Sequence, residues 1–128
     1  MSSRDASKNQ GIAEEIKSLG RQVLSLSCDV SSEAAVKELF KETAKTFPNR
    51  PIDVVVFNPT RMARGGVLNI TGKEVEDSFK VTVLGCLYVA QAALPIFLNQ
   101  KYGTVSIYVE ALPILVLVCL DGMIFSSF

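Results

Sequence analysis

The feature that most limits the fold of this chain is the apolar run IDVVVF at residues 52–57. Four of its six residues are β-branched, and such side chains favour extended backbone. After Asp53 the run contains no polar residue, and a continuous apolar run is typical of a strand that is covered on both faces. We therefore expect a strand over residues 53–58 within a parallel sheet.

Helix and strand patterns alternate along the rest of the chain. Ser7 and Gln10 have the spacing of a capping box before apolar residues at helical intervals, and Gly20 stands where that helix would end. The stretch QVLSLSCDV alternates apolar residues with serines, which is typical of a half-buried strand. The alternation predicts an α/β domain. Its helices are expected near 7–19, 32–47 and 72–98, and its strands at 22–28, 53–58 and 104–109.

The longest expected element is the helix near residues 72–98. Thr71 and Glu74 have the spacing of a capping box at its start. Apolar residues then recur at helical intervals, and we expect the face that they form to pack in the core. This face comprises Val75, Phe79, Val83, Leu87, Ala90 and Leu94.

Composition excludes several classes of function. Thirteen basic residues balance thirteen acidic ones without a long charged block, so binding to nucleic acid is not expected. The chain has no histidine, and its three cysteines lack zinc-like spacing. A metal site with histidine ligands, a Ser-His-Asp triad and a Cys-His nucleophile are therefore excluded. The first ten residues contain no apolar stretch, so a cytoplasmic setting is expected rather than secretion.

The last eighteen residues, ALPILVLVCLDGMIFSSF, do not continue the alternation. Their apolar stretch is shorter than the roughly 20 residues that cross a bilayer, so membrane insertion is not expected. We interpret residues 111–128 as a hydrophobic tail that is buried or misplaced, with membrane association as the alternative. Residues 1–110 then form the domain.

Four stretches together resemble the short-chain dehydrogenase/reductase family: SSR, CDV, VVVFNPT and FKVTVLGCLYVAQAALPIF. The resemblance covers about residues 2–109. It implies an incomplete Rossmann-type, doubly wound parallel sheet with flanking helices, and a partial NAD(P)-binding domain over residues 1–110. The first strand of the family would lie between the strand that includes SSR and the strand VVVF.

The resemblance also implies four cofactor-binding residues. Arg4 corresponds to an arginine that meets the 2'-phosphate of NADP, Asp29 and Val30 to the pair beside the adenine, and Asn58 to the turn after the fourth strand. Each position has a simpler reading. Arg4 can be a solvated charge, Asp29 the start of a helix cap, and Asn58 part of an ordinary turn. Pro59 also departs from the family's turn, because it removes a backbone donor.

Two parts of the family's machinery have no counterpart in the sequence. No Gly-x-Gly turn follows a strand, so the usual grip on the pyrophosphate is missing. Tyr88, Tyr102 and Tyr108 have no lysine four residues on, and Thr82 stands in place of an active-site Asn. We therefore expect no catalytic residues. NADP or NAD is the cofactor of intact relatives, and binding by this chain is expected to be weak or absent.

Two other functions remain open. In the family the long helix also builds dimer contacts. The chain can therefore be a non-catalytic interaction protein, forming homo- or hetero-oligomers through the helix at 72–98. The second alternative is a membrane-associated fragment held by the tail at 111–128.

Overall fold

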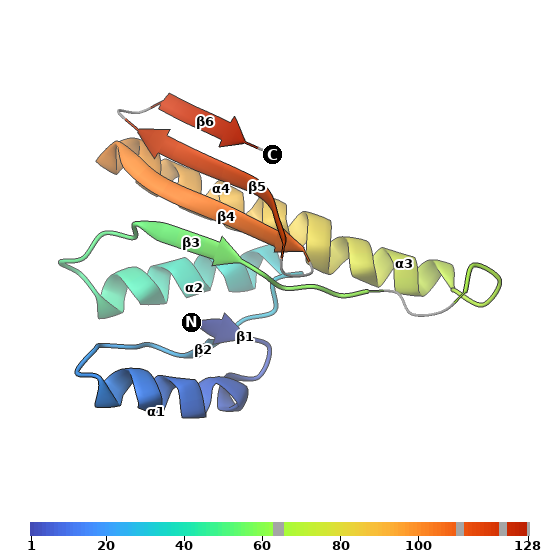
Figure 1. Cartoon of the computed structure of the whole chain (residues 1–128), viewed down its shortest axis with the longest axis horizontal. Helices are drawn as coiled ribbons and strands as arrows, with labels where there is room; N and C mark the ends of the chain where they lie inside the picture. The colour runs from blue at the N-terminus through green and yellow to red at the C-terminus, as the bar shows by residue number, and fades with distance from the viewer. Residues whose placement is uncertain (63–65, 110–111, 121–122, 128) are drawn as a thin grey trace.

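The computed structural model describes residues 1–62, 66–109, 112–120 and 123–127, with side chains up to Tyr108. Its strands form two sheets, with helices packed against them (Figure 1). The smaller sheet pairs β1 (Ser2–Ser3) in parallel with β2 (Leu26–Ser27). The larger has the order β3-β4-β5-β6 and comprises β3 (Val54–Phe57), β4 (Tyr102–Val109), β5 (Leu112–Leu120) and β6 (Met123–Ser127).

The larger sheet is mixed. β3 and β4 run parallel, with Val55 opposite Val105, whereas β5 and β6 add in antiparallel fashion beyond β4. The tail predicted at 111–128 therefore has strand backbone at 112–120 and 123–127, which the sequence did not suggest. The α/β class and the incomplete parallel sheet are confirmed for the part of the chain before it.

β1 and β3 lie at the inner edges of the two sheets and point in the same direction (Figure 1). Each is paired on one side only within the described residues, β1 with β2 and β3 with β4. This is the position where the resemblance places a further strand. Unpaired strand edges are open to association, because they present free N–H and C=O groups.

The first helix begins differently from the prediction. A 3-10 turn at Ala6–Asn9 precedes α1 (Gln10–Ser18), and the side chain that caps the turn is Asp5 rather than Ser7. The Asp5 carboxylate accepts hydrogen bonds from both the backbone N–H and the hydroxyl of Ser7. The predicted end is confirmed, since Gly20 adopts a φ of 72° just beyond the helix.

The strand predicted at 22–28 is only two residues long in the structure. Its partner β1 pairs Ser2 with Leu26 and Ser3 with Ser27, and the Met1 ammonium donates to the carbonyl of Leu24 at 2.8 Å. Among the described residues, no strand pairs with residues 22–25, which leaves them outside the sheet. Strand length here depends on the partner, which the alternating pattern does not reveal.

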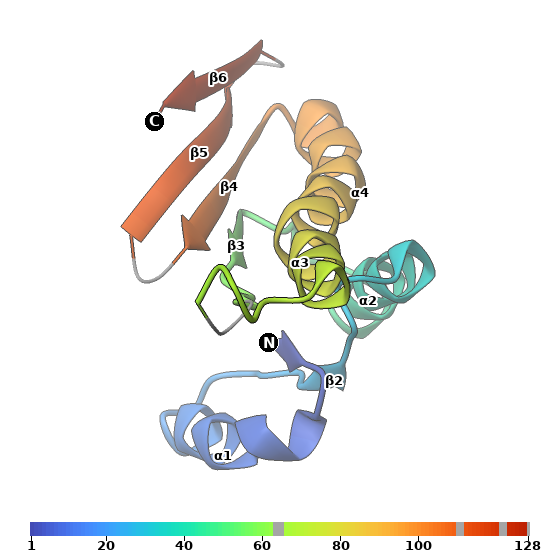
Figure 2. The same cartoon turned by 90° about the vertical axis from the view of Figure 1, so that its right-hand side faces the viewer.

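Helix α2 (Glu33–Thr46) and the long helix cover one face of β3 and β4 (Figure 2). Phe57 on β3 is buried there. The prediction that β3 is covered on both faces is wrong, because Val54 and Val56 are 59% and 61% exposed. The core lies on the covered face and comprises Cys28, Val36, Phe57, Val89, Ala93, Phe97, Val105 and Ile107.

The long helix has three parts: α3 (Gly72–Phe79), a π-helical turn at Lys80–Leu84, and α4 (Gly85–Gln100). The predicted capping box is present, since the Thr71 N–H donates to the Glu74 carboxylate at 2.8 Å and the Glu74 N–H to the Thr71 hydroxyl at 3.3 Å. The predicted core face is wrong. Four of its residues, Val75, Phe79, Val83 and Leu87, are about half exposed. The helix instead buries Gly85, Val89, Ala93 and Phe97.

Within the described residues, the helix Gly72–Gln100 is long and apolar enough to cross a membrane. Only 22% of its most apolar window is buried. Length and composition alone are weak evidence that this helix crosses a membrane, because the core helix of a globular domain meets the same criteria.

Candidate functional site

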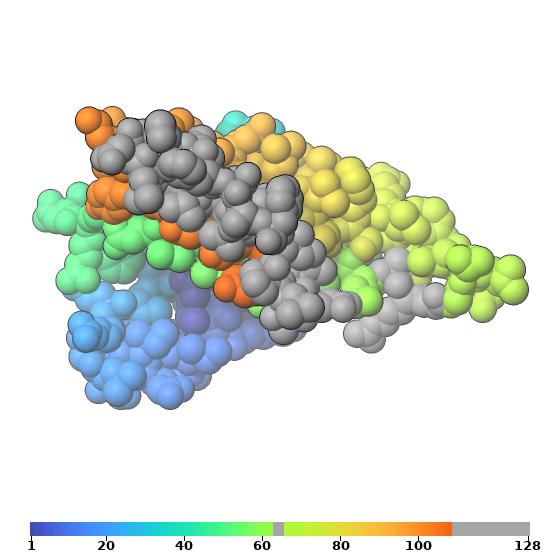
Figure 3. All heavy atoms as spheres, turned by 45° about the horizontal axis from the view of Figure 1, so that its top comes forward, coloured from blue at the N-terminus to red at the C-terminus, as the bar shows by residue number. Residues whose placement is uncertain are grey.

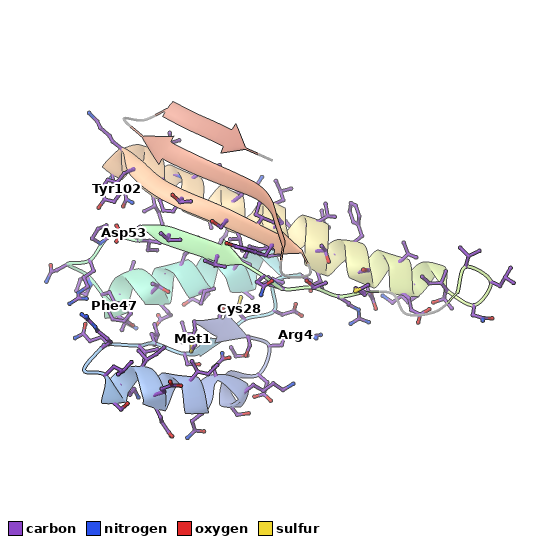
Figure 4. All side chains as sticks on the ribbon, viewed as in Figure 1. Met1, Arg4, Cys28, Phe47, Asp53 and Tyr102 are labelled. Carbon is purple, nitrogen blue, oxygen red and sulfur yellow. The ribbon has the colours of Figure 1, made fainter. Side chains whose placement is uncertain are left out.

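Three of the predicted cofactor residues directly follow the carboxyl ends of parallel strands. Arg4 follows β1, Asn58 follows β3, and Asp29 comes two residues after β2. In Figure 4, Arg4 lies at this end of β1, away from Phe47, Asp53 and Tyr102, which lie at the opposite end of the sheets. Ligands of open parallel sheets bind at the carboxyl edge.

Asp29 organises a tight turn between β2 and α2. Its carboxylate accepts from the Ser31 N–H at 3.0 Å and from the Ser31 hydroxyl at 2.7 Å. Its carbonyl accepts from the Ser32 N–H at 3.0 Å, and Ser32 then caps α2 by accepting from the Ala35 N–H at 3.3 Å. The hydrogen bonds from Ser31 hold the pKa of the Asp29 carboxyl below its ordinary value. The turn therefore presents a fixed anion at neutral pH.

Arg4 lies beside this turn. Its exposed side chain is near enough for its positive charge to help lower the pKa of Asp29. Its carbonyl accepts a hydrogen bond from the Ser27 hydroxyl at 2.8 Å, which ties the end of β1 to β2. Within the described residues, no carboxylate lies within 4.0 Å of the guanidinium, so it can meet an incoming anion. The pairing of β1 with β2 thus places Arg4 and Asp29 at the same end of the smaller sheet.

Val30 and Asn58 have different surroundings. Val30 is half-buried and packs against the core and against Gly85 of the long helix. Asn58 is exposed directly after the buried Phe57. In the part of the chain that the structure describes, no hydrogen bond joins Asn58 to Arg4 or Asp29. Its place beside a cofactor stays a prediction.

Gly85 is a residue of this region that the sequence reasoning did not single out. A Cβ atom on Gly85 would lie 3.0 Å from the Val30 carbonyl oxygen and 3.1 Å from its Cγ2. The long helix therefore touches the turn that holds Asp29 and Val30. The available signal was a glycine inside a helical pattern. Glycine destabilises a helix relative to alanine, so its presence there indicates a position where close packing requires a small residue.

The side chains that could take part in a reaction lie on different elements of the fold. Tyr88 and Tyr108 are half-buried on α4 and β4, Tyr102 is 40% exposed at the opposite edge, and Thr82 lies half-buried in the π-helical turn. Burial raises the pKa of the Cys28 and Cys86 thiols, which disfavours the reactive thiolate. Among the described residues, no three histidine, cysteine, aspartate or glutamate side chains gather as a metal site would require.

Two hollows lie away from the candidate site, of about 200 Å³ and 360 Å³. Both are lined by Gln22, Val23 and Phe47, near the amino end of β2 and the end of α2. They are open to solvent, and none of the predicted cofactor residues lines them.

Comparison with known proteins is consistent across sequence and structure. Residues 1–109 match the family described as short chain dehydrogenase. An uncharacterized oxidoreductase of Staphylococcus aureus (strain USA300) is 29% identical over 103 residues, which are 80% of this chain and 43% of that protein. An uncharacterized oxidoreductase of Schizosaccharomyces pombe is 32% identical over 85 residues, or 66% of this chain and 32% of that protein. The chain thus spans less than half the length of these relatives.

Solved structures show the same fold. An alcohol dehydrogenase from the archaeon Thermococcus sibiricus, complexed with 5-hydroxy-NADP, has a TM-score of 0.74 and 23% identity, covering 83% of this chain and 44% of that one. A short-chain type dehydrogenase/reductase from Mycobacterium marinum has a TM-score of 0.76 and 22% identity, covering 88% of this chain and 48% of that one.

Proposed function

This chain belongs to the short-chain dehydrogenase family, and we propose that it forms the adenosine side of the cofactor site of an NAD(P)-dependent oxidoreductase. The observation that carries the proposal is that Arg4 and the Asp29 turn follow the carboxyl ends of two adjacent parallel strands, tied together by the hydrogen bond from the Ser27 hydroxyl to the Arg4 carbonyl. NADP or NAD would supply the hydride acceptor or donor when bound. In a full-length relative, the substrate would be a carbonyl compound or an alcohol.

The residues present fit one half of such a cofactor. The Arg4 guanidinium is exposed and can bind a phosphate through its forked donors. Asp29 is held in place by Ser31, and the half-buried Val30 offers an apolar surface to a base. The other half has no comparable grip, because the sequence contains no Gly-x-Gly turn after a strand to receive the pyrophosphate.

Nucleotide binding by this chain is therefore expected to be weak and to favour the adenosine end. Titration calorimetry with adenosine 2',5'-bisphosphate, AMP and nicotinamide mononucleotide measures this preference. The adenosine nucleotides should bind better than the nicotinamide nucleotide. Replacing Arg4 by glutamine should weaken the binding of the bisphosphate more than the binding of AMP, since only the bisphosphate carries the 2'-phosphate.

Arg50→Gln is the matched control, because Arg50 is exposed and precedes β3, at the opposite edge of the sheet. Equal losses in the two variants would show a general charge effect and contradict the assignment of Arg4. Binding of NADP at about micromolar affinity or better would contradict the importance of the missing pyrophosphate grip.

A second role is supported by the exposed apolar face of the long helix. Residues 81–98 contain no charged side chain, and the yellow surface of this helix is widely visible in Figure 3. Val75, Phe79, Val83 and Leu87 are each 48–52% exposed at intervals of four residues. An exposed apolar stripe is typical of a surface that takes part in an interaction. We propose that it pairs with the same helix of a second copy, or of an intact relative.

Replacing Val83 by lysine should convert the oligomer to a monomer, because it places a charge in the centre of the stripe. The measurement is the mass in solution by sedimentation equilibrium. Val67→Lys is the control, since Val67 is 89% exposed but lies in the loop before the helix. A wild-type chain that is monomeric at all concentrations, or a Val67→Lys variant that dissociates equally, would rule out the helix stripe as the interface.

A further inference from the structure

Gly85 is the first residue of α4 and is buried where the long helix passes the Asp29–Ser32 turn. A Cβ atom there would lie 3.0 Å from the Val30 carbonyl oxygen, 3.1 Å from Val30 Cγ2 and 3.2 Å from Val30 Cβ. These distances are shorter than ordinary van der Waals contacts. A side chain at this position would therefore require Val30 to move by a few tenths of an ångström.

The other helical glycines do not share this feature. A Cβ atom on Gly11 in α1 or on Gly72 in α3 would meet no atom within 4 Å. Glycine weakens a helix relative to alanine, so its presence at a buried contact calls for a packing explanation. At Gly85 that explanation is the backbone of Val30.

The turn that Gly85 touches has little freedom to move. It is closed by the hydrogen bond from the Ser32 N–H to the Asp29 carbonyl, and Ser32 is fixed in turn as the cap of α2. Val30 lies in the middle of the turn and packs against the core. Pressure from the helix on Val30 would thus be transmitted to the backbone that carries Asp29.

The π-helical turn at Lys80–Leu84 directly precedes this contact. A π turn contains an extra residue and changes the register of the helix that follows it. Here it brings Gly85 to the inner face at the level of the turn. The buried residues Val89, Ala93 and Phe97 then follow Gly85 at intervals of four.

We infer that Gly85 is a positioning residue for the adenosine side of the cofactor site, because it lets the long helix seat the Asp29–Val30 turn. The inference rests on the proposed function. It assigns no contact between Gly85 and the cofactor. Gly85 acts by allowing the approach of the helix to Val30, because a Cβ atom there would press on the backbone and side chain of Val30 in the turn.

The test compares Gly85→Ala with Gly72→Ala and Gly11→Ala. We expect Gly85→Ala to shift the backbone amide resonances of Asp29 to Ser32, because the turn moves by a few tenths of an ångström. The same variant should weaken the binding of adenosine 2',5'-bisphosphate roughly tenfold. The two control variants should leave both readouts at the wild-type values.

Unchanged amide resonances and unchanged affinity in Gly85→Ala would overturn the inference. If Gly85→Ala does not fold, the wild-type chain decides, since a nuclear Overhauser effect between the Gly85 α-protons and the Val30 methyl protons is required and its absence overturns the contact. A wild-type chain that binds no nucleotide would contradict the cofactor role of the turn and of Gly85 together. The resonance shifts would still report the contact itself, so the two failures are distinguishable.

Discussion

Replacing Gly103 by alanine is expected to remove most of the stability of this chain. Gly103 is the second residue of β4 and has a φ of 145°, which residues with a side chain rarely adopt. A Cβ atom there would lie 2.3 Å from two carbon atoms of the Phe97 ring. Phe97 is 0% exposed, so its ring has no room to retreat. Backbone strain and overpacking each cost about 1–3 kcal/mol, a large part of the roughly 5–15 kcal/mol that stabilises a typical domain.

Urea denaturation followed by circular dichroism measures this effect. Phe97→Ala alone should cost about 3–5 kcal/mol through the cavity that it leaves. The double variant Gly103→Ala/Phe97→Ala should lose less than the sum of the two single variants, because the alanine methyl occupies the space of the missing ring. Gly72→Ala is the control, since Gly72 has no neighbour to displace. Stability equal to wild type in Gly103→Ala would contradict the packing of α4 on β4.

Helices and strands were predicted correctly where interactions between neighbouring residues determine them. The Thr71–Glu74 capping box and the apolar intervals after it gave the long helix, and Gly20 gave the end of the first helix. The β-branched run gave β3. In each case the determining interactions lie within a few residues of one another, so they can be recognised without knowing the fold.

The errors arise where a partner decides the outcome. The long helix is apolar on nearly every side between residues 81 and 98, so periodicity could not tell the buried side from the exposed one. Burial was decided by Gly85 and Ala93, whose small size allows the close approach of the helix. The strand at 22–28 shortened to Leu26–Ser27 because β1 pairs with only two of its residues. The strand backbone at 112–120 depends on pairing with β4.

In the candidate site, too, the local features could be predicted from the sequence and the long-range contact could not. The end of the strand before Asn58 could be predicted from the sequence pattern, whereas Arg4 and Asp29 were predicted from the resemblance to the family. The hydrogen bonds of Ser31 with Asp29 follow from a local turn and lower the pKa of that carboxyl. The contact of Gly85 with Val30 joins positions 55 residues apart in the chain, which is the difference of their numbers. Such a contact becomes visible only in the folded structure.

The second large effect expected is the complete loss of turnover in this chain relative to intact members of the family. Dehydrogenation requires a fixed nicotinamide, a polarised carbonyl oxygen and a proton donor suited to neutral pH. General acid help is worth about 10²–10⁴-fold, and positioning up to roughly 7–11 kcal/mol. No lysine stands four residues after a tyrosine, and no Gly-x-Gly turn follows a strand in this sequence. The resemblance implies that Thr82 stands in place of an active-site Asn, so we expect this chain to provide neither contribution.

The measurement that tests this account most directly is absorbance at 340 nm, with NADP(H) and NAD(H) and a panel of ketones and alcohols. We predict no change in absorbance with the purified chain. Turnover that co-purifies with the chain and disappears on replacing Tyr88, Tyr102 or Tyr108 by phenylalanine would contradict the account, because it would place a complete catalytic centre within these residues. Turnover that survives all three replacements would identify a contaminating enzyme, and a constant trace would bear out the prediction.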